Sequence, residues 1–153
     1  MIVCLGGTFN YLHKGHEYLI LKALEIAGND GSVFIGLTTG NLIKNKGEIK
    51  SFKVRKKDIE NFLLEKGQIE FVTIKPIKDK FGPTLEEEFD AIVVSPETKK
   101  TAIEINQIRE QKGKKPLKIV QIPFVLAKDG KPISSTRIAN KEIDENGNIL
   151  DKE

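Results

Sequence analysis

Two histidines lie three residues apart near the N-terminus, in the segment Gly6-Gly7-Thr8-Phe9-Asn10-Tyr11-Leu12-His13-Lys14-Gly15-His16, and the chain has no others. Each imidazole can donate a hydrogen bond to a phosphoryl oxygen, and Gly15 leaves room for close approach. The earlier glycines let backbone amides face a phosphate, and the positive end of a following helix attracts an anion. The segment therefore indicates a phosphate site, with His16 in the first helical turn.

A second candidate anion site lies near the C-terminus, at Ile133-Ser134-Ser135-Thr136-Arg137. Three hydroxyls followed by an arginine at the start of a short helix offer hydroxyl donors, backbone amides and a guanidinium that matches phosphate. The 25 basic residues include only three arginines, Arg55, Arg109 and Arg137. A chain that otherwise uses lysine therefore keeps the permanently charged guanidinium at few places.

Simpler interpretations of both segments stay open. The histidines can cap a helix or lie exposed without a ligand, and two histidines can also begin a metal site, although no HExxH pattern or further spaced ligand accompanies them. Ser134 or Ser135 can be an ordinary N-cap. The chain lacks a G-x-x-x-x-G-K-[ST] motif, which excludes a P-loop kinase or GTPase. Cys4, the single cysteine, lies in an apolar run and is expected to be a buried thiol.

The elements that must position these residues follow from apolar periodicity. Short continuous apolar runs predict strands at 2–5, 32–38, 69–77, 91–95 and 118–123. Helical spacing predicts helices at 14–27, 53–66 and 97–112. This alternation predicts an α/β fold, a single Rossmann-like doubly wound domain with a five-stranded parallel sheet flanked by helices on both faces. The glycine turn after the first strand then lies at the carboxyl edge of the sheet, where ligands bind.

Length and composition limit the remaining possibilities. A chain of 153 residues fits one domain, 1–153, in which 140–153 form a C-terminal extension with a frayed end. The net charge of +3 comes from interleaved basic and acidic residues, and aromatic residues make up 7%, which argues against nucleic-acid binding. No membrane span or signal peptide is apparent, so we expect a cytoplasmic protein without a membrane partner. The segments 39–51 and 126–134 are loops long enough to carry function.

These segments together resemble the HxGH nucleotidyltransferases, and within them the phosphopantetheine adenylyltransferases of the archaeal and eukaryotic type. The resemblance extends over nearly the whole chain, through GGTFNYLHKGH, PIKDKFGPT, FDAIVVSPET, AIEINQIR, ISSTRI and IDENGNIL. It implies an enzyme of coenzyme A biosynthesis that transfers the adenylyl group of ATP to 4'-phosphopantetheine. The products would be dephospho-coenzyme A and pyrophosphate, with no covalent enzyme intermediate.

The resemblance also implies roles for individual residues. The expected catalytic residues are His16, His13, Thr8 and Arg137. The expected ATP contacts are Gly6, Gly7, Thr8, Phe9, His13, Gly15, His16, Ser95, Asn106, Arg109, Ser134, Ser135, Thr136 and Arg137. The expected acceptor contacts are Lys44, Lys46, Lys50, Asp79 and Phe81, where any one of the three lysines can pair with the acceptor phosphate. Mg²⁺ is expected as cofactor, bound mainly through ATP phosphates and not by a protein metal site.

Two alternatives to this function remain. The same scaffold serves adenylyl or cytidylyl transfer to other phosphorylated acceptors, such as nicotinamide mononucleotide, flavin mononucleotide or glycerol phosphate. A domain that binds ATP for regulation without reacting is the alternative from another class. The sequence leaves the oligomeric state open.

Overall fold

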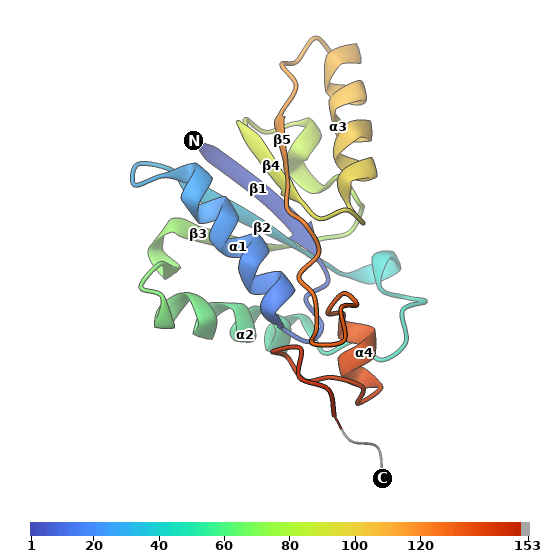
Figure 1. Ribbon diagram of the computed structural model, residues 1–153. Coiled ribbons are helices and arrows are strands. Elements are labelled where there is room, and N and C mark those ends of the chain that lie inside the picture. Colours follow the sequence, from blue (N-terminus) through green and yellow to red (C-terminus); the bar gives the residue numbers. More distant parts are fainter. Residues whose placement is uncertain (151–153) are drawn as a thin grey trace.

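Five parallel strands form the sheet of the computed structural model, which describes residues 1–150 (Figure 1). The strands are β1 (Ile2–Gly7), β2 (Ser32–Thr38), β3 (Val72–Ile77), β4 (Ala91–Val94) and β5 (Lys118–Gln121). The helices are α1 (Lys14–Ala27), α2 (Phe52–Glu65), α3 (Lys99–Gln111) and α4 (Ser135–Ala139), with 3-10 turns η1 (Gly40–Leu42), η2 (Ile69–Phe71) and η3 (Gly82–Leu85). In the order β3-β2-β1-β4-β5, β2 and β3 lie on one side of β1, and β4 and β5 lie on the other. The carboxyl ends of β1 and β4 therefore border the crevice in which such sheets bind ligands.

Helices cover both faces of the sheet, as the alternating pattern predicts. Successive side chains of a strand point to opposite faces. Val3 and Leu5 of β1 belong to the apolar cluster that includes residues of α1 and α2, while Cys4 belongs to the cluster beneath α3. The doubly wound α/β architecture is thus confirmed, and Cys4 is the buried strand thiol that its apolar neighbours predict.

Element boundaries differ from the prediction in a few places. Residues 69–71 form the turn η2 instead of the start of β3, because Gly67, at φ 66°, reverses the chain and the Phe71 amide bonds to the Gln68 carbonyl. Helix α3 begins at Lys99 and not at residue 97, since Ser95 and Thr98 form a hydrogen-bonded turn ahead of it. β1 continues through Gly6 and Gly7, which pair with β2.

The C-terminal segment packs against the domain up to residue 150. Ile143 is fully buried in a small apolar cluster with Ala127 and Ile133, and an antiparallel bridge joins Ile143 to Ile149. The Asp144 carboxylate caps the turn between them by accepting from the Asn146 and Asn148 amides. The expected frayed end falls on 151–153, outside the described residues. No helix within residues 1–150 is long and apolar enough to cross a membrane.

Candidate active site

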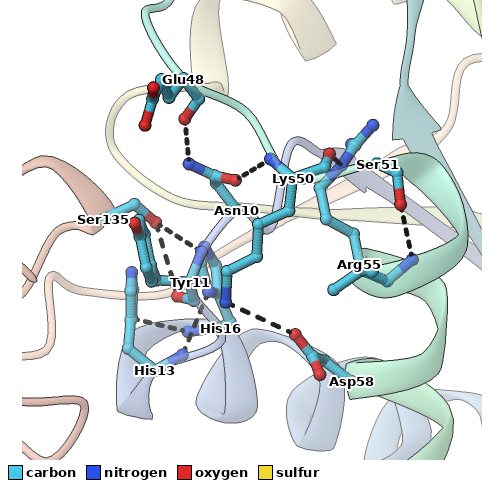
Figure 2. Close-up of polar contacts among 11 residues, drawn as sticks. Asn10, Tyr11, His13, His16, Glu48, Lys50, Ser51, Arg55, Asp58 and Ser135 are labelled. Atoms are coloured by element: carbon cyan, nitrogen blue, oxygen red, sulfur yellow. Dashed lines mark hydrogen bonds and ion pairs between the residues drawn. The ribbon is translucent and has the colours of Figure 1, made fainter. Parts of the chain in front are cut away.

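One large cavity, of about 940 Å³, opens at the carboxyl edge of the sheet, and both ends of the chain contribute to its wall. Ser135 links the two ends, because its hydroxyl accepts a hydrogen bond of 3.4 Å from the Tyr11 amide (Figure 2). The predicted site residues that line the cavity are Gly6, Gly7, Thr8, Phe9, His13, Gly15, His16, Lys46, Phe81, Ser95, Ser134, Ser135 and Thr136. The other predicted site residues, Lys44, Lys50, Asp79, Asn106, Arg109 and Arg137, do not line it.

The two histidines form the N-terminal cap of α1. Nδ1 of His13 accepts from the Gly15 amide at 3.0 Å and the His16 amide at 3.3 Å, and Nδ1 of His16 accepts from the His13 amide at 3.3 Å. A ring nitrogen that accepts carries no proton, so the hydrogen of each neutral imidazole lies on Nε2. The rings stack with their centroids 3.7 Å apart. Helix capping thus uses Nδ1 of each ring, and the predicted phosphate contact would use Nε2.

Both imidazoles are neutral at physiological pH. Burial lowers the pKa of His13 to about 4. Burial, together with the neighbouring His13, lowers the pKa of His16 to about 3. Each ring therefore has a neutral Nε2–H group, which can donate a hydrogen bond to a phosphoryl oxygen.

The amides in the first turn of α1 donate to acceptors within the protein. The Lys14 amide donates to the Glu145 carbonyl at 3.0 Å, and the next two amides donate to His13. Gly15 serves the cap directly, since a Cβ at this position would lie 2.8 Å from Cε1 of the His13 ring. The histidine side chains, with the helix dipole behind them, are left to meet an anion.

Thr8 and Lys46 form a second polar group on the cavity wall. The Thr8 hydroxyl lies 2.8 Å from the Thr38 hydroxyl and accepts from Nζ of Lys46 at 3.1 Å. Among the three candidate lysines, the structure therefore places Lys46 at the cavity. Lys50 instead lies over the Tyr11 ring, 4.5 Å from its centroid, and Lys44 is exposed away from the cavity.

Helix α4 presents its hydroxyls to the cavity but turns Arg137 away from it. Ser134 is the N-cap, as the simpler interpretation proposed, and accepts from the Arg137 amide at 3.2 Å. The Arg137 guanidinium pairs with Asp129 and Glu142 and donates to the Pro132 carbonyl. The phosphate contact expected of Arg137 stays a prediction. Residues of a helix advance by about 100° each, so residue 137 lies opposite the face that carries 135, 136, 139 and 140.

Asn106 and Arg109, expected to contact the nucleotide, instead bind the backbone. The Asn106 amide exchanges two hydrogen bonds with Leu117, at 2.9 and 2.7 Å. Arg109 is buried, and its guanidinium donates to the carbonyls of Lys115, Thr84 and Glu87. Hydrogen bonds of both side chains hold α3 to the adjoining loops, and neither side chain lines the cavity.

Of Asp79 and Phe81, which were expected to line the acceptor arm, only Phe81 lines the cavity. Phe81 lines the cavity at its apolar end, together with Phe34, Ile92 and Ile105, a lining suited to an uncharged chain. The carboxylate of Asp79 caps the turn by accepting from the amides of Phe81 and Gly82 at 3.0 and 2.9 Å. Asp79 is therefore a turn residue and not a lining residue.

Asn10 and Arg55 are buried polar residues near the cavity that were not predicted as site residues. The Asn10 amide donates to the Glu48 carbonyl at 3.0 Å and accepts from the Lys50 amide at 2.8 Å (Figure 2). Arg55 binds three backbone carbonyls in the same region. Backbone partners leave no pattern in a sequence, and the rarity of arginine was the only available signal for Arg55.

The chain is similar to known proteins in both sequence and structure. The profile of the family described as cytidylyltransferase-like matches residues 4–141. Phosphopantetheine adenylyltransferases of Methanosarcina mazei and Methanosarcina acetivorans are 49% and 50% identical over 148 residues, which is 96% of this chain and 96% and 94% of those proteins. A solved structure from Archaeoglobus fulgidus, described as a protein with unknown function, has a TM-score of 0.72 at 36% identity, covering 80% of this chain and 89% of that one.

Proposed function

The chain belongs to the cytidylyltransferase-like family, and from this premise we propose that it is a phosphopantetheine adenylyltransferase. It transfers the adenylyl group of ATP to 4'-phosphopantetheine, giving dephospho-coenzyme A and pyrophosphate. Relatives that carry this name match nearly the full chain at up to 50% identity.

The observation that carries the proposal is the meeting of the two chain ends in one cavity. Nε2–H donors of His13 and His16 share its wall with the hydroxyls of residues 134–136. Such a set of neutral donors, with Lys46 beside Thr8, can hold a polyanion at several points. The volume of about 940 Å³ accommodates a nucleotide together with an acceptor.

The reaction needs positioning and charge stabilisation more than covalent help from the protein. An oxygen of the acceptor phosphate attacks the α-phosphorus of ATP in line, and the bond from that phosphorus to pyrophosphate breaks. We assign His16, supported by His13, to the oxygens of the transferred group, where charge develops. We assign Ser134, Ser135 and Thr136 to the β- and γ-phosphates, and Lys46 to the acceptor phosphate.

ATP enters this site as its magnesium complex in our proposal. Among residues 1–150, no three His, Cys, Asp or Glu side chains form a cluster that could hold a metal ion. We assign phosphate oxygens of ATP as the ligands of Mg²⁺, as is usual for this metal. The metal would neutralise charge on the departing pyrophosphate.

Pyrophosphate release tests the proposal. The wild-type protein is incubated with ATP or CTP and with 4'-phosphopantetheine, nicotinamide mononucleotide, flavin mononucleotide or glycerol phosphate, with and without Mg²⁺. We expect release with ATP, 4'-phosphopantetheine and Mg²⁺. Preferential turnover of another acceptor would reassign the substrate. If calorimetry shows that ATP binds but no acceptor leads to pyrophosphate release, the protein is a nucleotide-binding domain instead.

A further inference from the structure

Arg55 of α2 is a buried cation whose polar partners are all backbone carbonyls. Its side chain is 1% exposed. Nε donates to the Lys50 carbonyl at 2.8 Å, and Nη1 donates to the carbonyls of Thr8 and Thr38 at 3.0 and 2.9 Å. No ion pair formed within residues 1–150 includes Arg55, so these carbonyls alone compensate its burial there.

The three carbonyls belong to three segments that meet at the cavity. Thr8 lies in the turn after β1, Thr38 ends β2, and Lys50 ends the loop before α2. Figure 2 shows Arg55 on one side of Lys50 and Asn10 on the other. The Asn10 side chain is hydrogen-bonded to the backbone of Glu48 and of Lys50. Arg55 and Asn10 thereby fix the last residues of the loop that carries Lys46.

The contact between Lys46 and Thr8 depends on both of the segments that Arg55 holds. Nζ of Lys46 donates to the Thr8 hydroxyl at 3.1 Å, so the loop and the turn must keep their relative positions. Long exposed side chains such as that of Lys46 have several rotamers, and ordering them costs entropy. A fixed backbone on both sides limits the orientations that Lys46 can adopt above the cavity.

An apolar residue at position 55 would leave three backbone carbonyls without this donor, so the guanidinium is tied to the positions of those carbonyls. A lysine at position 55 would keep the charge but has a single head group, which cannot reach three carbonyls in the planar geometry of the guanidinium. Arginine at position 55 is therefore suited to hold three backbone segments at fixed positions beside the cavity.

We propose that Arg55 is a positioning residue, which holds the turn at Thr8 and the loop before α2 so that Lys46 and Thr8 face the substrate phosphates together. This inference rests on the proposed function for its activity measurement. Arg55 touches no substrate in this arrangement and acts through Lys46 and Thr8.

A double-mutant cycle tests this coupling. Turnover is measured by pyrophosphate release in the wild type, in R55K, in K46A and in the double variant. We expect R55K to lower kcat about 10-fold or more, because small misplacements of a phosphate contact can cost up to about 10²-fold. In the K46A background the same change should lower kcat by a smaller factor, less than about threefold, since Lys46, one of the two groups that Arg55 positions, is already gone.

Arg109 is the matched control, because it also binds three backbone carbonyls from a buried position, at a different part of the fold. R109K should lower kcat by the same factor with and without K46A. Limited trypsin digestion supplies a readout independent of activity. Cleavage after Lys44 and Lys46 should be at least several-fold faster in R55K than in the wild type or R109K.

Equal effects of R55K in both backgrounds, or unchanged trypsin cleavage, would overturn the inference. A second variant, R55Q, is made in parallel, with folding checked by circular dichroism. If neither variant folds, Arg55 serves the fold and not the site, and the inference fails. A wild type that releases no pyrophosphate would refute the proposed function, while the trypsin comparison would still decide whether Arg55 holds the loop.

Discussion

His13 and His16 show how one side chain can serve structure and chemistry together. Their Nδ1 atoms close the start of α1, and this fixes the tautomer that carries the hydrogen on Nε2. Protonation of either ring would require an Nδ1 that currently accepts to become a donor. The capping interpretation and the phosphate interpretation of these histidines, which are alternatives in sequence, are therefore compatible in the structure.

Replacing His16 should separate catalysis from binding. If Nε2–H of His16 stabilises charge that develops in the transition state, His16→Ala should lower kcat by about 10²- to 10³-fold. The Kd for ATP, measured by calorimetry, should change by only a few-fold, because several other donors hold the ground state. Tyr18→Ala, at an exposed position of the same helix, is the control and should change neither quantity. Comparable losses of kcat and ATP affinity would contradict the assigned role.

The low histidine pKa values predict how stability depends on pH. Folding lowers the pKa of His13 to about 4 and that of His16 to about 3, from the usual histidine value of 6.5. Unfolded chains therefore bind protons below about pH 6.5 that the folded protein does not, and the free energy of unfolding falls as pH falls toward 4. Urea unfolding at pH 7, 6 and 5 measures this above the range where most carboxylates titrate.

A double variant, His13→Asn with His16→Asn, is the control for that measurement. It removes both imidazoles, so its unfolding free energy should change little between pH 7 and pH 5. A wild-type protein equally stable at pH 7 and pH 5 would show that the imidazoles are protonated as easily in the folded state as in the unfolded chain.

At the level of elements, the orientation of α4 decides which of its residues can reach a ligand. Ser135, Thr136, Ala139 and Asn140 line the cavity, whereas Arg137 pairs on the far side with Asp129 of the loop 126–134. The ion pair holds the pKa of Asp129 below its usual range. Arg137 thereby links α4 to the loop 126–134, which directly precedes this helix.

Paired variants distinguish this linking role from direct phosphate binding. If Arg137 acts through the loop, Arg137→Gln and Asp129→Asn remove the same contact and should change the KM for ATP by similar small factors, about twofold. Steady-state kinetics with varied ATP measures both. A rise of 10-fold or more in Arg137→Gln alone would show that the guanidinium contacts the nucleotide, as the sequence first suggested.

The elements themselves were predictable, because strands buried on both faces appear in sequence as continuous apolar runs. The runs at 2–5 and 91–95 correspond to the central strands β1 and β4, and helical spacing placed α1 at its observed bounds. The orientation of Arg137 was not predictable, since moving a helix start by one residue rotates every side chain by about 100°. The partners of Asn106 and Arg109 were hidden for another reason, because any residue can supply a carbonyl.

At the scale of the whole molecule, the site depends on segments from both ends of the chain lying side by side. The parallel sheet explains part of this, because every strand ends at the edge where the glycine turn lies. The closure by the C-terminal segment was not predicted. Figure 1 shows α4 and the residues after it beside the start of α1, where the Glu145 carbonyl accepts from the Lys14 amide at 3.0 Å.

Shortening the chain tests whether this closure matters to the site. A variant ending at Asn140 loses Ile143, which is fully buried, and the carbonyl that completes the cap of α1. We expect a lower melting temperature, because burying an isoleucine in a core contributes about 2 to 5 kcal/mol. We also expect a fall in kcat of about 10-fold or more, because the turn that orients both imidazoles loses an anchor.

Two point variants separate the effects of that shortening. Ile143→Ala removes the buried side chain but keeps the Glu145 carbonyl, so it should lower the melting temperature while retaining most of kcat. Ile149→Ala, at a position that is 50% exposed, should change neither. If the shortened chain melts earlier yet keeps its kcat below the melting temperature, the C-terminal segment supports the fold alone. The histidine turn would then be held by its own cap, since the capping bonds between His13 and His16 do not involve that segment.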